Sequence, residues 1–85
     1  MSKVDQIKVT IQYYAILKEQ RGKSEEVLVT AARTPLELYH HIQSKYHLQI
    51  SEKFLKVAVN DEFCSWDTAL KEGDKVIFVP PVAGG

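Results

Sequence analysis

The chain has little of what would assign it to a class at once. Its 85 residues include one cysteine, and 11 Lys and Arg balance 11 Asp and Glu, so the formal net charge is zero. A single thiol excludes an internal disulfide, and the lack of a basic excess argues against nucleic-acid binding. No run approaches the roughly 18 apolar residues of a membrane span, and MSKVDQIKV lacks a signal segment. We therefore expect a cytoplasmic protein that binds neither nucleic acid nor membrane.

Motifs for catalysis and metal binding are also lacking. His40 and His41 point about 100° apart on a helix, and no cysteine stands near them or His47 in the sequence, so we predict surface histidines and no metal site. Cys64 has no CxxC partner, which favours a structural role. There is neither a glycine-rich phosphate loop nor an HExxH helix. The body of the chain therefore offers no catalytic constellation.

The first half of the chain carries clear strand patterning, within an apolar content of 45%. IKVTIQYY alternates with period two, which predicts a half-buried strand whose inward face holds Ile7, Val9, Ile11 and Tyr13. EEVLVTA, residues 25–31, predicts a second strand that forms a long hairpin with the first. The intervening AILKEQRGK, with Gly22 as its stop, is compatible with a helical turn or with a loose connection.

One amphipathic helix follows these strands. Thr34 is a suitable cap, Pro35 suits the first helical position, and Glu37 lies three residues after the cap. The pattern predicts a helix that runs to about His47. Its apolar stripe recurs at three- and four-residue steps, at Leu36, Tyr39, Ile42 and Tyr46.

The second half predicts three further strands. FLKVAVN is the first of them, with alternate apolar residues in phase, and a turn at residues 60–62 leads to FCSW, a short strand or extended piece. A turn around Gly73 and Asp74 leads to the last strand, about Lys75 to Val79, which two prolines end. One helix must then cover a mixed sheet of about five strands, which predicts an α+β, ubiquitin-like β-grasp roll at residues 1–79.

Residues 80–85, PPVAGG, predict an extended tail. Gly84 and Gly85 have no Cβ, so they can enter a channel too narrow for other residues. Fully extended, these six residues span at most about 20 Å from the domain. Pro80 and Pro81 stiffen the first part of that span in a polyproline-like form. The α-carboxylate of Gly85 is then a reactive group on a thin arm. The alternative is a frayed terminus, although at average composition a chain ends in Gly-Gly only about 0.5% of the time.

The chain resembles the small subunit of molybdopterin synthase, the MoaD family, over nearly its whole length. The resemblance rests on IKVTIQYYAILKEQRG, TPLELYHHI, VAVN, TALKEGD and FVPPVAGG after EGDKVIFV. PPVAGG is its most specific part, since Gly-Gly alone is shared by many ubiquitin-like proteins. The resemblance implies a sulfur carrier whose catalytic side chains belong to another subunit.

The family's chemistry implies a role for the tail. An activating enzyme uses ATP to adenylate Gly85, which then becomes a thiocarboxylate, while Gly84 gives it passage. The sulfur goes to cyclic pyranopterin monophosphate in the large synthase subunit, in an assembly of two small and two large subunits. This chain itself would bind no cofactor and no metal.

Strand phase adds a prediction about where partners bind. If the core side holds Phe78 and Tyr13, then Val79 and Tyr14 face outward, and the family uses an apolar patch near these positions and near Phe63. We expect this patch to bind both partners, unless all three side chains are buried or scattered. The expected partner-binding residues are Tyr14, Phe63, Phe78, Val79, Pro80, Pro81, Val82 and Ala83.

Three other functions remain open from the sequence. A sulfur carrier for tRNA thiolation or thiamine synthesis would use the same activated glycine, although PPVAGG differs from the tails of thiamine carriers. A protein modifier would join the glycine to lysine amines. An interaction domain with an inert tail would use no activated glycine at all.

Overall fold

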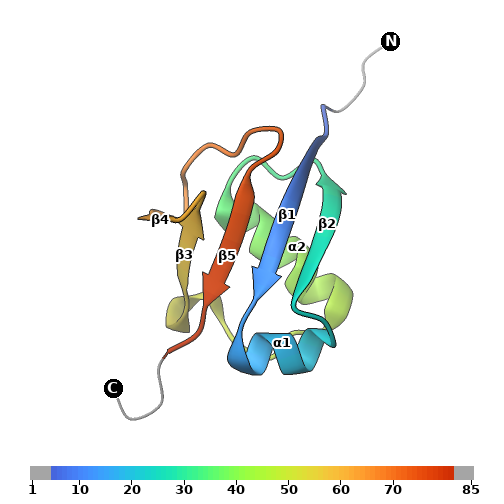
Figure 1. Cartoon of the computed structure of the whole chain (residues 1–85), viewed down its shortest axis with the longest axis vertical. Helices are drawn as coiled ribbons and strands as arrows, with labels where there is room; N and C mark the ends of the chain where they lie inside the picture. Colours follow the sequence, from blue (N-terminus) through green and yellow to red (C-terminus); the bar gives the residue numbers. More distant parts are fainter. Residues whose placement is uncertain (1–4, 82–85) are drawn as a thin grey trace.

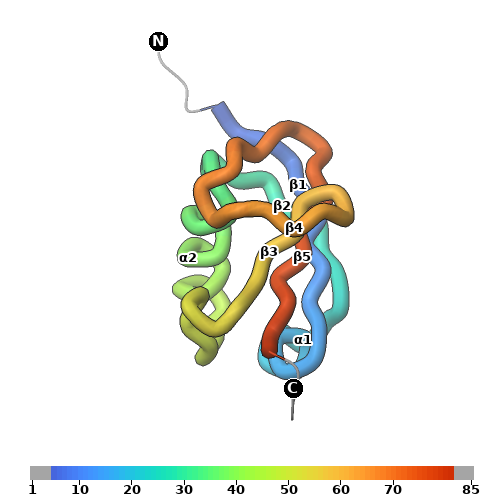
Figure 2. The backbone as a smooth tube through the Cα atoms, turned by 90° about the vertical axis from the view of Figure 1, so that its left-hand side faces the viewer, coloured from blue at the N-terminus to red at the C-terminus, as the bar shows by residue number. Residues whose placement is uncertain are grey.

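Five strands form one mixed sheet in the computed structural model, which describes residues 5–81 (Figure 1). Their order across the sheet is β2-β1-β5-β3-β4, and α2 packs on one face (Figure 2). This arrangement confirms the predicted α+β roll with one main helix. The strands are β1 (Ile7–Tyr13), β2 (Glu25–Thr30), β3 (Lys56–Val59), β4 (Glu62–Cys64) and β5 (Lys75–Val79), and the main helix is α2 (Pro35–Tyr46).

The first and last strands lie side by side at the centre of the sheet. β1 pairs parallel with β5, from Thr10 opposite Lys75 to Tyr13 opposite Phe78. β1 also pairs antiparallel with β2, and β3 pairs antiparallel with both β5 and β4. Because β1 and β5 run in the same direction, their carboxyl ends meet at one edge of the sheet, next to the start of the tail.

A short helix, α1 (Ala15–Arg21), fills the connection that the sequence left open. Gly22 ends it with a φ of 85°, in the left-handed region where glycine carries no steric penalty. Ala15 begins it with a φ of 52°, which is uncommon for a residue with a side chain. Both views place α1 at the end of the sheet to which β1 and β5 run (Figures 1 and 2).

Helix α2 begins as predicted. The Thr34 side chain accepts a hydrogen bond from the Glu37 N–H at 3.2 Å, and the Glu37 carboxylate accepts one from the Arg33 N–H at 2.7 Å. The predicted apolar stripe was partly wrong, because Leu38 is fully buried while Leu36 is only half-buried. The helix buries a stripe at three- and four-residue steps that starts one position earlier than predicted, at Pro35, Leu38, Tyr39 and Ile42.

Strand β5 is anchored by an aromatic cluster beneath the sheet. The ring of Phe78 lies 5.1 Å from that of Tyr39, edge to face, and 5.9 Å from that of Trp66, nearly parallel. Phe78 and Tyr39 are both fully buried, and Trp66 closes the rim of the core. Such offset and edge-to-face contacts add about 0.5–1.5 kcal/mol per pair to the burial of the rings. The strand that leads to the tail is therefore firmly held.

Strands β3 and β4 form a hairpin through Asn60 and Asp61. Both residues have positive φ, 54° and 71°, as a two-residue type I′ turn requires. Asn60 also reaches the start of β5, where its Nδ2 donates to Asp74 Oδ1 at 2.9 Å and its Oδ1 accepts from the Lys75 N–H at 3.0 Å. These hydrogen bonds join the turn of the hairpin to the start of β5.

Among the residues that the structure describes, no helix has both the length and the apolar content to cross a membrane.

Candidate functional site

The tail leaves the domain where β5 ends. Pro80 is buried and Pro81 is exposed, so the chain passes from core to solvent within two residues. The predicted carrier Gly85, the passage residue Gly84 and the stem residues Val82 and Ala83 lie outside the described residues. What the structure describes is the surface around the point of exit.

Tyr14 lies beside the exit, on the face of the sheet opposite α2. It follows Tyr13, whose side chain is buried, and its own side chain is 49% exposed. The Tyr14 hydroxyl donates to Gln12 Oε1 at 3.2 Å, and Gln12 pairs across the sheet with Ile77. This contact directs the ring of Tyr14 over the helix-free face. The prediction that Tyr14 faces outward is confirmed.

Phe63 and Val79 lie on the same helix-free face. Phe63, in β4, is 70% exposed and pairs with Ala58, which pairs in turn with Ile77. Ala58 and Ile77 are buried and lie between Phe63 and β1 across the sheet. Val79 is half-buried. We call Tyr14, Phe63 and Val79 the outer-face cluster.

Two of the predicted partner-binding residues belong to the interior instead. Phe78 is 0% exposed within the aromatic cluster, and Pro80 is buried. Their side chains cannot contact a partner while the domain is folded, so the prediction is corrected for both. Pleating explains Phe78, because alternate residues of a strand face opposite sides of the sheet. Their role is to hold the end of β5 in place, while Val79 and Pro81 are available for contact.

A partly buried polar network supports the end of β1. The Tyr13 hydroxyl donates to Glu26 Oε2 at 2.5 Å, and the Arg21 guanidinium donates to both Glu26 oxygens at 3.0 and 2.7 Å. Burial alone would raise the pKa of Glu26, but the hydrogen bonds from Arg21 and Tyr13 outweigh it, and the pKa lies below its ordinary value. The network ties β1, α1 and β2 together directly before Tyr14.

The three histidines lie at the surface, and Cys64 packs against the core. All three histidines are exposed, and His40 Nε2 contacts Glu52 Oε1 at 3.1 Å. Within residues 5–81, no group of three or more His, Cys, Asp or Glu side chains is placed to hold a metal ion. Cys64 pairs with buried Val57 across the hairpin and packs against the core.

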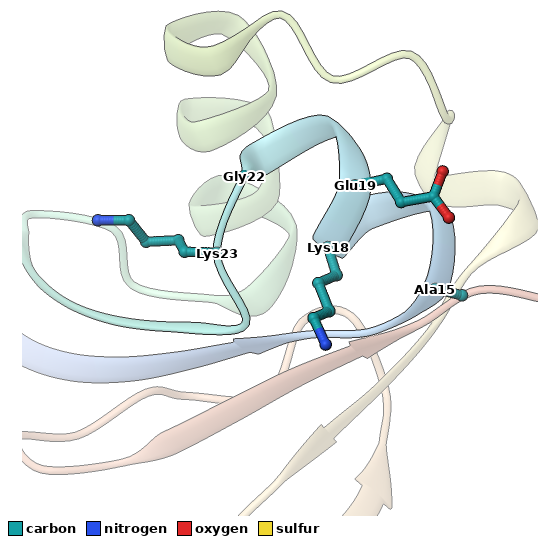
Figure 3. Close-up of a pocket in the computed structure, with 5 residues that line it drawn as sticks. All are labelled: Ala15, Lys18, Glu19, Gly22 and Lys23. Atoms are coloured by element: carbon teal, nitrogen blue, oxygen red, sulfur yellow. The ribbon is translucent and has the colours of Figure 1, made fainter.

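A hollow on α1 does not form an active site. It is lined by Ala15, Lys18, Glu19, Gly22 and Lys23 (Figure 3). Figure 3 shows the two lysine side chains and Glu19 pointing in three different directions. General acid–base or nucleophilic chemistry needs groups within hydrogen-bond reach of one another, and these groups do not converge.

An apolar surface on the other side of the exit was missed by sequence reasoning. Ile50, Phe54 and Pro81 line it, together with Gln49 and Ser51. Phe54 is 68% exposed and belongs to a 3₁₀ turn, η1 (Glu52–Phe54). Strand phase could not place Phe54, because it lies in this turn and outside β3 (Lys56–Val59). We call Ile50, Phe54 and Pro81 the tail-base shelf.

The fold and the site together define a class. A five-strand mixed sheet with parallel central strands over one main helix is the ubiquitin-like β-grasp, and here its last strand leads out beside exposed apolar side chains. The chain belongs to the ThiS family, whose model matches residues 11–85, and within it to the small sulfur-carrier subunits of molybdopterin synthase type.

Three comparisons carry this assignment. The chain is 34% identical to a molybdopterin synthase sulfur carrier subunit of Mycobacterium tuberculosis, over 93% of this chain and 99% of that protein. It is similar to the structure of a putative molybdopterin converting factor, subunit 1, from Pyrococcus furiosus, with a TM-score of 0.72 and 29% identity over 89% of this chain and 99% of that one. It also matches a chain in a complex of subunits 1 and 2 of molybdopterin-converting factor from Helicobacter pylori, with a TM-score of 0.64 and 29% identity over 93% and 100% of the two chains.

Proposed function

We propose that this chain carries sulfur as a thiocarboxylate on Gly85 and donates it to cyclic pyranopterin monophosphate, in molybdenum cofactor synthesis. One observation carries the proposal: in a member of this family, the last strand ends beside the outer-face cluster, where Tyr14 and Phe63 are 49% and 70% exposed. Exposed apolar side chains gathered near one functional segment are typical of a protein-binding surface. Residues 80–85 would be the arm that this surface presents.

The proposed chemistry uses the α-carboxylate of Gly85. On an activating enzyme, a carboxylate oxygen attacks the α-phosphorus of ATP, which releases pyrophosphate and leaves an acyl-adenylate. A sulfide equivalent from a donor displaces AMP and leaves the thiocarboxylate. Its nucleophilic sulfur then bonds to a carbon of the pterin precursor as a carbon–oxygen bond at that carbon breaks and the oxygen leaves, and water cleaves the acyl–sulfur bond to restore the Gly85 carboxylate. ATP would be bound by the activating enzyme, and this chain would hold no cofactor of its own.

Two partners follow from this chemistry. One is the activating enzyme, and the other is a large synthase subunit that supplies the catalytic side chains. The Helicobacter pylori complex of subunits 1 and 2 supports the second. We propose that the outer-face cluster binds both partners in turn, in a cytoplasmic assembly that contains two small and two large subunits. Gly84 would pass through the narrow entrance that leads to the large subunit's active site.

Deletion of Gly85 tests the proposal. The deletion should leave the melting temperature unchanged, because the core lies within the sheet and α2, and it should abolish formation of molybdopterin by the reconstituted synthase. Retained activity would show that sulfur transfer does not need the carboxylate at the Gly85 position, and would favour an interaction domain with an inert tail.

The identity of the acceptor separates the proposal from the two remaining alternatives. Wild-type thiocarboxylate is offered in parallel to the pterin precursor with the large subunit, to tRNA with a thiolation enzyme, and to protein lysines. Sulfur should reach the pterin. Sulfur found only in tRNA would assign the chain to another pathway, and an isopeptide bond to lysine would make it a protein modifier.

A further inference from the structure

The segment that carries Ile50 and Phe54 in the tail-base shelf is held by hydrogen bonds. The Ile50 carbonyl accepts hydrogen bonds from the Tyr39 hydroxyl and from Gln43 Nε2, both on α2. The turn η1 is capped by Ser51, whose side chain accepts from the Lys53 N–H at 3.2 Å. Hydrogen bonds to α2 therefore hold Ile50, and the capped turn that follows it, on the helix side of the tail.

Phe54 stands out from this fixed frame. Its side chain is 68% exposed although Leu55, the next residue, is buried in the core at 6% exposure. The shelf holds no other aromatic residue, and Pro81 completes it from the far end of the chain. An aromatic ring on a preorganised frame loses little conformational entropy on binding, which suits it to a binding hot spot.

The position of Pro81 limits what can cover the shelf. Four residues follow Pro81 in the chain, and an extended run of that length spans at most about 14 Å. A protein that receives the Gly85 carboxyl group in an internal active site must bring its entrance within that distance of Pro81. Since Pro81 is part of the shelf, the rim of that entrance lies within about 14 Å of the shelf, close enough for contact.

We infer that Phe54 and the rest of the tail-base shelf form a second docking contact for the large subunit, and that an apolar side chain on the rim of its tail entrance packs on Phe54. The inference rests on the proposed function and adds to it. The outer-face cluster would contact the partner on the helix-free side of the tail, and the shelf would contact it on the α2 side. The two contacts together would aim the tail into the entrance.

Phe54→Ser tests the inference in the full chain. We measure its dissociation constant for the isolated large subunit by calorimetry, beside the wild type and Phe54→Leu. Phe54→Ser should bind about tenfold more weakly, whereas Phe54→Leu keeps an apolar contact and should stay within about twofold of the wild type. The melting temperatures should match, because Phe54 lies outside the core.

Two further variants distinguish a failure of the shelf contact from a failure of the proposed function. Val29→Thr changes another exposed apolar side chain, 53% exposed on β2, and should bind as the wild type does. Phe63→Ser, in the outer-face cluster, should weaken binding as Phe54→Ser does. If the wild type and Phe63→Ser behave as expected but Phe54→Ser binds normally, the shelf contact is wrong and the proposed function stands. If the wild type does not bind the large subunit, both are wrong.

Two other occupants of the shelf would each overturn the assignment. A second copy of the chain would give a wild-type dimer in sedimentation that Phe54→Ser dissociates. The activating enzyme would give slower thiocarboxylate formation by Phe54→Ser, with normal affinity for the large subunit. The inference requires a monomeric wild type, normal thiocarboxylate formation and a loss confined to the large subunit.

Discussion

Glu26 joins four elements through one carboxylate. It accepts hydrogen bonds from Tyr13 of β1 and Arg21 of α1, and the Tyr46 hydroxyl of α2 lies 3.4 Å from it. The Arg21 guanidinium also lies over the Tyr46 ring, 3.6 Å from its centroid. The Glu26 side chain is only 9% exposed, so loss of its charge would leave Arg21 with no equivalent partner at that place.

Glu26→Gln should lower the free energy of unfolding at neutral pH by about 1–3 kcal/mol. The pKa of Glu26 is lower in the folded state than in the unfolded chain. Its contribution is therefore fully present above the unfolded value of about 4.3 and is lost as the pH falls through the folded pKa. The difference between Glu26→Gln and wild type, measured by urea unfolding, should shrink progressively below about pH 4.

Glu25→Gln is the matched control for this prediction. Glu25 is the preceding residue on β2, and it accepts one hydrogen bond, from Gln12 Nε2, at the exposed face of the sheet. Its replacement should cost less than about 0.5 kcal/mol. Equal losses for the two variants, or a Glu26→Gln difference that stays constant into acid, would contradict the structural role of the network.

At the scale of elements, the rotation of α2 decides which leucine supports the core. The sequence predicted Leu36, but Leu38 is 0% exposed and Leu36 is half-buried. Leu38→Ala should therefore lower the free energy of unfolding by about 2–5 kcal/mol, and Leu36→Ala by about half as much or less. Chemical denaturation of the two variants measures the difference. A larger loss for Leu36→Ala would mean that the helix is rotated toward the sequence-based stripe.

The elements differ in how far sequence alone determines them. β5 was predicted with the right bounds and β1 to within one residue, since it ends at Tyr13 and not Tyr14, because period-two alternation and terminal prolines act locally. The sequence left α1 open between a helical turn and a loose connection, since it begins at a left-handed Ala15 that no local pattern predicts. The register of α2 also depended on tertiary packing, which selected Leu38 over Leu36.

The residues of the candidate site were also predicted from the sequence only in part. Strand phase correctly placed Tyr14 on the exposed face, and the family resemblance pointed to Phe63, which is exposed as well. It also placed Phe78 inward, so the prediction of Phe78 as a partner contact conflicted with its own phase. The tail-base shelf was missed because it joins Phe54 and Pro81, and no local pattern brings these distant residues together. Their meeting depends on β3 and β5 pairing antiparallel, with Lys56 opposite Val79.

At the scale of the whole molecule, the parallel pairing of β1 with β5 organises the surface around the exit. It brings residues from the two ends of the chain to one edge of the sheet, so that Tyr14 lies near the point where the tail begins. The outer-face cluster and the tail-base shelf then flank that point. In the proposed function, the folded domain positions residues 80–85, and the partner proteins supply the nucleotide, the sulfur and the pterin precursor.

The most direct test of sulfur carriage is the intact mass of the full chain. The chain is incubated with its activating enzyme, ATP and a sulfur donor, and then with the large subunit and cyclic pyranopterin monophosphate. The first step should raise the mass by one oxygen-to-sulfur exchange, located at Gly85 by fragmentation, and the second should return it to the starting value as molybdopterin forms. A mass that never changes, or a sulfur located at Cys64, would contradict the proposed role of Gly85.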